Sequence, residues 1–144
     1  MKSSVCNQYY GTVLSVKGGV VNDEVEIMLD SGNTRMTAII TSAASKSMGL
    51  ETGKNVVTII KEEWVILMKD TEGYRFSSRN RFPGTVVSVK ESSVDTEVHM
   101  RLVGGESLTA IVTSDAAKSL DIKTGDNMTA LIKAPMVLVG AKEE

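Results

Sequence analysis

Hydroxyl, amide and cationic side chains gather at three kinds of position in this sequence, and each position occurs twice. They stand before a β-like segment, at the junction of a β-like segment with a short helical one, and at the end of a later β-like segment. Hydroxyls and free backbone N–H groups donate hydrogen bonds to a small oxyanion, Lys offers a point charge and Arg a planar fork. We therefore predict oxyanion binding by Ser4, Asn7, Thr41, Ser42, Lys61, Ser77, Arg79, Asn80, Thr113, Ser114 and Lys133.

Each of these residues also has an ordinary structural explanation. Thr-Ser before a helix is most often a cap, and Lys at a strand end is most often a solvated charge. No other reactive group stands out: His99 is the single histidine, and it alternates with Val98 and Met100 as a surface strand residue does. We find no cluster with metal-ligand spacing, no phosphate-binding glycine loop and no nucleophile with a general base. The pattern favours a binding protein over an enzyme.

The candidate residues recur because the chain contains one unit twice. Gly11–Lys17 (GTVLSVK) returns as Gly84–Lys90 (GTVVSVK), an offset of 73 residues, and Thr37–Ser42 (TAIITS) returns as Thr109–Ser114 (TAIVTS), an offset of 72 residues. A tandem repeat of this kind sets the number of modules. A module of this size buries too little surface to be robust alone, so we expect it to pack against its twin or another chain.

Each copy is predicted to hold five strands and one short helix. Apolar–polar alternation and β-branched residues indicate the strands, and glycine-rich pairs indicate the turns. We expect strands at 9–17, 21–29, 35–41, 56–61 and 64–68 with a helix at 42–48, then strands near 81–90, 93–103, 107–113, 127–133 and 135–139 with a helix near 114–120. This is the strand plan of an OB-type barrel. The predicted fold class is therefore all-β, with two tandem OB-type five-stranded β-barrels over residues 1–70 and 71–144.

Composition restricts the partners of the chain. The formal net charge is −2 and aromatic residues make up 4%, so the chain lacks the basic surface and stacking platforms on which nucleic-acid binding depends. Cys6 is the single cysteine, which excludes a disulfide framework and fits a reducing compartment. We expect neither a signal peptide nor a membrane-spanning segment, and we expect a cytoplasmic location.

At these residues the sequence resembles the Mop family of molybdate-binding proteins, the molbindins. The family opens with Ser-Ala-Arg-Asn-x-x-x-Gly-x-Val, and Ser77–Val86 reads SSRNRFPGTV. Its later strand motifs, Val-x-x-Glu-Val, Leu-Thr-Ala-Ile-Ile-Thr and Ala-Leu-Ile-Lys-Ala, are matched at 21–25, 36–41, 94–98, 108–113 and 130–134. One motif alone is weak evidence, but the ordered set covers nearly the whole chain.

The resemblance implies intracellular storage or homeostasis of molybdate, with tungstate as a substitute ligand and no organic cofactor. It also implies a homo-oligomer, expected to be a trimer of two-module chains, with oxyanions bound at the interfaces between modules. Neither a membrane nor nucleic acid is an expected partner. The contacts carried over from the family pattern are Ser77, Arg79, Thr113 and Lys133, with Ser4, Thr41 and Lys61 in the first copy.

The chain departs from the family pattern mainly in its first copy. Cys6 stands where the motif has Arg, and Glu62 and Glu63 follow the strand-end Lys. Ala44 and Ala116 replace a Ser that is common in the family. Carboxylates repel a bound dianion unless they point away from it. Sites that contain the arginine of the second copy are therefore expected to bind anion more tightly.

Three alternative functions stay open at this point. The chain could be a molybdate sensor that reports to a partner, or an OB-type module that binds nucleic acid or protein. The low aromatic content and mild acidity argue against nucleic acid. An enzyme of molybdenum-cofactor assembly is the third alternative, and the lack of a general base beside a nucleophile argues against it.

Overall fold

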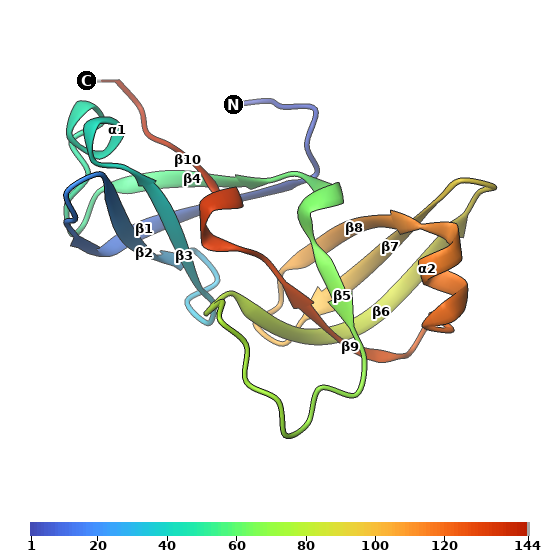
Figure 1. Ribbon diagram of the computed structural model, residues 1–144. Helices are drawn as coiled ribbons and strands as arrows, with labels where there is room; N and C mark the ends of the chain where they lie inside the picture. Colours follow the sequence, from blue (N-terminus) through green and yellow to red (C-terminus); the bar gives the residue numbers. More distant parts are fainter. Residues whose placement is uncertain (144) are drawn as a thin grey trace.

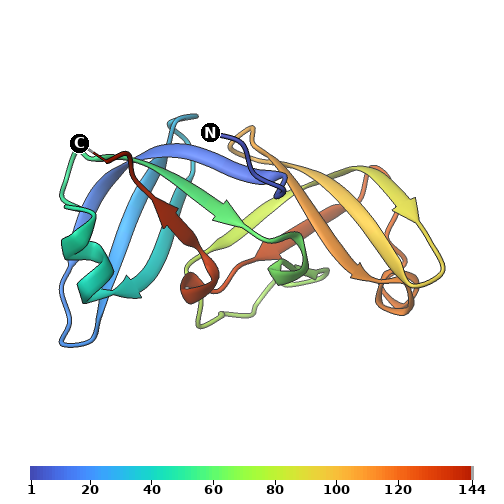
Figure 2. The same cartoon turned by 90° about the horizontal axis from the view of Figure 1, so that it is seen from above.

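The computed structural model describes residues 1–143 and folds into two curled five-stranded antiparallel sheets, which lie end to end (Figure 1, Figure 2). The first copy supplies β1 (Asn7–Lys17), β2 (Asn22–Leu29), β3 (Arg35–Thr41), α1 (Ser42–Ser47), β4 (Asn55–Ile60), the 3-10 helix η1 (Glu62–Trp64) and β5 (Ile66–Met68). The second copy supplies β6 (Arg81–Glu91), β7 (Asp95–Leu102), β8 (Ser107–Thr113), α2 (Ser114–Ser119), β9 (Asn127–Leu131), the 3-10 helix η2 (Ala134–Met136) and β10 (Leu138–Gly140). The predicted all-β class and the two five-stranded units are confirmed.

The predicted strands and helices agree with the structure except near the end of each copy. There we expected the fifth strands to start at residues 64 and 135, with only a bend at Glu62 and Glu63 before the first of them. Instead a 3-10 helix intervenes, and the strands begin at Ile66 and Leu138. A single turn of 3-10 helix is too short to show a repeating pattern of apolar residues in the sequence. Pro135 at the start of η2 is the one local signal, because its fixed φ suits a first helical turn.

The fifth strands are exchanged between the two sheets. The first sheet has the order β10-β4-β1-β2-β3, and the second has the order β5-β9-β6-β7-β8. Leu138 of β10 pairs with Ile59 of β4, and Ile66 of β5 pairs with Leu131 of β9. Figure 1 shows β5 in green and β10 in red, each crossing to the sheet of the other copy. Each sheet therefore holds four strands of one copy and one strand of the other. The boundary between two modules at residues 1–70 and 71–144 stays a prediction.

Alternating apolar residues make the core of each sheet. In β2 every second residue is buried, including Val25 and Ile27, and β7 repeats the pattern with Val98 and Met100. Gly11 of β1 shows why glycine recurs in the repeat, as a Cβ there would lie 2.6 Å from the carbonyl oxygen of the facing strand. Both α-helices have six residues, and no helix of residues 1–143 is long and apolar enough to cross a membrane.

Candidate oxyanion-binding regions

A buried asparagine joins each copy to the sheet of the other. The Asn80 amide accepts a hydrogen bond from the Thr37 backbone N–H at 2.8 Å and donates one to the Thr37 carbonyl oxygen at 2.7 Å. Asn7 makes the same pair of bonds with Thr109, also at 2.8 and 2.7 Å. Both side chains are almost fully buried. The two predicted site asparagines therefore pair with strand backbone, as a neighbouring strand would, and hold the preceding segments in place.

The residue before each asparagine faces a glutamate of the other copy. Arg79 forms an ion pair with Glu24 of β2, and both side chains are partly exposed. In the first copy Cys6 takes the place of the arginine, and Glu97 of β7 takes the place of Glu24. Partial desolvation raises the pKa of the Cys6 thiol, and the charges of Glu62 and Glu97 add to the shift. The two copies therefore place a cation and a neutral thiol at equivalent points.

The strand-end lysines start the two 3-10 helices. The carbonyl oxygen of Lys61 accepts from the Trp64 N–H at 3.0 Å, and that of Lys133 accepts from the Met136 N–H at 2.9 Å. Because the fifth strands are exchanged, η1 packs against β8 and η2 packs against β3. Both lysines are exposed. Lys61 lies 3.8 Å from the Glu63 carboxylate, whereas Lys133 has no carboxylate within 4 Å in the described part of the chain.

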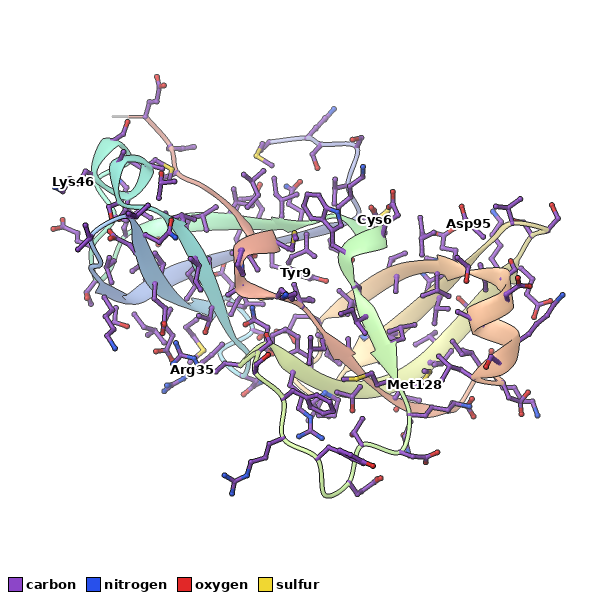
Figure 3. The ribbon with its side chains drawn as sticks, in the orientation of Figure 1. Cys6, Tyr9, Arg35, Lys46, Asp95 and Met128 are labelled. Carbon is purple, nitrogen blue, oxygen red and sulfur yellow. The ribbon has the colours of Figure 1, made fainter. Side chains whose placement is uncertain are left out.

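Two pseudo-equivalent regions result. We call the segment around Ser77, Arg79 and Asn80, together with Lys133, the Arg79 region; it lies against β2 and β3. We call the segment around Ser4, Cys6 and Asn7, together with Lys61 and Glu62, the Cys6 region; it lies against β7 and β8. Figure 3 shows Cys6 beside η1. The structure thus brings the opening motif and the strand-end lysine of one copy together on the sheet of the other.

The hydroxyl residues at the helix starts lie further along the same sheets. Thr41 and Thr113 are the N-caps of α1 and α2, and each hydroxyl oxygen accepts a backbone N–H at 3.1 Å. Thr41 lies four residues beyond Thr37 on β3, which is roughly 13 Å of strand. These threonines therefore do not meet the asparagines at one point, although each can still donate its hydroxyl proton.

The serines at the helix starts already have partners within the fold. Ser42 donates to the Asp23 carboxylate at 2.6 Å. Hydrogen bonds from Ser42 and Ser45 hold the pKa of Asp23 below its usual range. Ser114 bonds the Thr96 hydroxyl at 2.9 Å and is buried. By contrast Ser4 and Ser77 are exposed, and neither side chain has a hydrogen-bond partner among residues 1–143. An oxyanion contact by these residues stays a prediction.

The hollow beside Arg79 does not enclose the predicted set. Arg79 lines an open hollow of about 630 Å³ together with Arg35 and Arg81, and no other predicted site residue lines it. Arg35 is paired with Glu26 at 3.0 Å, and Arg81 bonds the Thr71 hydroxyl at 2.9 Å. The exposed candidates, which are Ser77, Arg79 and Lys133 in one region and Ser4 and Lys61 in the other, therefore lie on two open surfaces of the single chain.

Two acidic residues in these regions, Glu24 and Glu97, were not among the residues that the sequence singled out. Glu24 and Glu97 face the opening segments, and their signal was the glutamate that recurs at this place in both copies. Glu62 turns inward, and its Oε1 accepts the Cys6 N–H at 2.7 Å, while Glu63 points outward. His99, which we expected at the surface of a strand, is half-buried, with its ring nitrogens 3.2 Å from the Glu97 carboxylate and 3.1 Å from the Thr109 hydroxyl.

Comparison with known protein families assigns both copies to one domain type. The model of the TOBE domain matches residues 3–67 and 77–139. The molybdenum transport protein ModE of Herbaspirillum seropedicae is 33% identical over 144 residues, which is 100% of this chain and 53% of that protein. The molybdenum-pterin-binding protein MopA of Rhodobacter capsulatus is 36% identical over 139 residues, or 96% of this chain and 52% of that protein. The chain spans about half the length of these curated relatives.

A solved structure matches the chain over its full length. It is a crystal structure of the cytoplasmic molybdate-binding protein ModG with molybdate bound. The similarity has a TM-score of 0.93 and a sequence identity of 41%, and it covers 99% of this chain and 100% of that one. The whole architecture of two sheets is therefore shared with a protein of known ligand.

Proposed function

This chain belongs to the TOBE domain family, with two copies of the domain, and from this premise we propose that it binds molybdate as an intact oxyanion. The observation that carries the proposal is the likeness to molybdate-bound ModG over both chains at a TM-score of 0.93. The names of its relatives describe molybdenum transport, regulation and binding. No covalent chemistry is needed for this function.

The side chains of the Arg79 region suit this ligand. Molybdate is a tetrahedral dianion with four acceptor oxygens, and Arg79, Lys133 and the hydroxyl of Ser77 supply charge and hydrogen-bond donors. Hydrogen bonds to a charged group contribute about 1.5–3 kcal/mol each. A few such bonds suffice for roughly micromolar affinity once the costs of association are included.

We propose that the anion sites are completed by other copies of the chain. Within one chain the two regions are open, so a second molecule has to cover them to exclude water. Exposed apolar side chains occur at equivalent positions of both copies and support such contacts. They are Trp64 and Met136, and Ile66 and Leu138. A homo-oligomer, in the form of a trimer of two-module chains, accommodates these observations.

We further propose storage or homeostasis of molybdate in the cytoplasm as the cellular role, with tungstate accepted as a substitute. The similarity to ModG, a cytoplasmic molybdate-binding protein, supports the location. A sensor that reports molybdate to a partner is the second candidate. It is favoured by the 31% identity to the transcriptional regulator ModE of Yersinia pestis over 96% of this chain, which is 52% of that protein.

Elemental analysis of the purified oligomer tests molybdate binding. The protein is exposed to molybdate, desalted and analysed for molybdenum, with parallel samples that contain excess phosphate or sulfate and one that contains tungstate. We expect retained molybdenum that phosphate and sulfate do not displace and tungstate does. A protein free of molybdenum after this treatment would refute the proposal, and an Arg79→Ala/Lys133→Ala variant serves as the matched negative control.

A further inference from the structure

The two regions differ most at one carboxylate. Glu62 in η1 and Ala134 in η2 hold equivalent positions of the two copies, directly after the strand-end lysines. Glu62 is only 8% exposed, and its Oε1 lies 2.7 Å from the backbone nitrogen of Cys6. Its side chain thus points into the Cys6 region and not into solvent.

The equivalent donor in the other region is open. Ala134 has no polar side chain, and the backbone N–H of Arg79 has no acceptor among residues 1–143. The N–H that Glu62 occupies in one region is therefore available to a ligand in the other. A carboxylate and a molybdate oxygen are the same kind of acceptor, since each carries negative charge and no proton to donate.

The charged side chains around the two regions also favour an anion in the Arg79 region over one in the Cys6 region. Glu62 and Glu97 both act on the Cys6 thiol, and Lys61 is the cation of that region, already near Glu63. The Arg79 region has two cations, Arg79 and Lys133, against the single carboxylate of Glu24. An additional dianion is therefore stabilised in the Arg79 region and repelled in the Cys6 region.

We infer that the Glu62 carboxylate is a built-in substitute for the anion in the Cys6 region, so that each chain takes up molybdate at its Arg79 region alone. The inference rests on the proposed function and assigns unequal roles to the two copies. The Cys6 region is a site that the chain fills with its own carboxylate. Unequal occupancy then follows from sequence and needs no cooperativity between the regions.

Converting the Cys6 region into a copy of the Arg79 region tests the inference. The variants are Glu62→Ala, Cys6→Arg and their combination, and molybdate bound per chain is measured by equilibrium dialysis and elemental analysis. We expect the combined variant to bind about twofold more molybdate than the unmodified chain, because both regions then offer a free N–H and an arginine. Glu63→Ala removes the same charge from an outward-pointing residue of η1 and is expected to change nothing.

Glu62→Gln keeps the shape of the side chain and guards against a folding defect of Glu62→Ala. If the unmodified chain binds molybdate and the well-folded combined variant binds no more, the inference fails and the proposed function stands. Equal losses on Lys61→Ala and Lys133→Ala would also overturn it, because both regions would then already be filled. Absence of molybdate from the unmodified chain and all variants would refute the function and the inference together.

Discussion

At the scale of single residues, charge distinguishes two copies that are otherwise alike. Arg79 and Cys6 each precede a buried asparagine, Asn80 and Asn7 respectively. Arg79 carries a guanidinium, whereas Cys6 carries a neutral thiol. Hydrogen bonds to charged groups contribute more than those between neutral groups. The affinity of each region is therefore expected to depend on very few side chains.

Replacement of Arg79 should weaken molybdate binding, and replacement of Cys6 should not. Arg79→Ala removes a cation and its hydrogen bonds, and we expect affinity to fall roughly tenfold or more, since about 1.4 kcal/mol corresponds to tenfold. Cys6→Ala removes no charge. Isothermal titration calorimetry of both variants at one ionic strength measures the difference, and equal losses of affinity would contradict the prediction.

Glu106 links the two copies through its carboxylate. It accepts hydrogen bonds from the hydroxyls of Ser31 and Thr34, the latter at 2.6 Å. Partial burial acts to raise the pKa of Glu106, but the hydrogen bonds outweigh it and hold the pKa below the ordinary value of 4.5. A carboxylate with a depressed pKa stabilises the fold above its unfolded-state pKa. That stability is lost as the pH falls through the folded-state value.

The Glu106 carboxylate should therefore add to the free energy of unfolding only at pH values where it is ionised. We expect Glu106→Gln to unfold about 1 kcal/mol more easily than the unmodified chain above about pH 5. The gap should close as the pH falls below 4.5. Urea unfolding at a series of pH values measures this difference, and a gap that stays constant into acid would show that the charge of Glu106 is not involved.

At the scale of elements, the exchange of β5 and β10 decides how the candidate residues meet. It carries η1 and Lys61 to β8, and η2 and Lys133 to β3. Without the exchange each lysine would lie on its own copy, away from the opening segment that crosses over. The exchange also links the stability of the two sheets, since each depends on a strand from the other copy.

A substitution in β5 should therefore weaken the second sheet. Leu67 is buried and its strand pairs with β9, so Leu67→Ala is expected to cost about 2–5 kcal/mol. Hydrogen exchange should then speed up at the amides of β9 and β6. The Val20 side chain is fully exposed, so Val20→Ala is the control with unchanged exchange at these amides. Faster exchange confined to β4 and β1 would contradict the observed pairing.

At the scale of the whole molecule, the exposed apolar pairs indicate how chains associate. Ile66 lies on β5 and Leu138 on β10, each at one edge of its sheet, with exposed fractions of 47% and 59%. Apolar side chains at equivalent places of both copies present two similar surfaces on one chain. Two such surfaces suit closed assembly by several copies, because each copy can contact two neighbours.

Charges on these surfaces should dissociate the oligomer. We expect the Ile66→Asp/Leu138→Asp variant to sediment as a smaller species with its circular dichroism spectrum unchanged, because both side chains point away from the core. It should also lose bound molybdate if neighbouring copies complete the sites. Val103→Asp, in an exposed turn with no apolar counterpart, is the control that should sediment as the unmodified chain does. An unchanged sedimentation coefficient in the double variant would exclude these strands from the interface.

Local patterns in the sequence were enough to predict the two copies, the all-β class, most strand and helix positions and the family resemblance. Each of these depends on neighbouring residues or on a spacing that repeats. The residues of the opening motif were also visible as a set, as was the difference between Arg79 and Cys6. The buried bonds of Asn7 and Asn80 were not visible, because their partners lie 102 and 43 residues away.

Only the tertiary structure decided which copy each fifth strand joins and where Glu62 points. The strands β4 and β9 hold equivalent positions in the two copies, as do β5 and β10. The local sequence therefore does not distinguish exchange of the fifth strands from its absence. The direction of Glu62 depends on a 3-10 helix and on a backbone N–H 56 residues away. Both outcomes depend on contacts distant along the chain, and these form only when the two copies pack together.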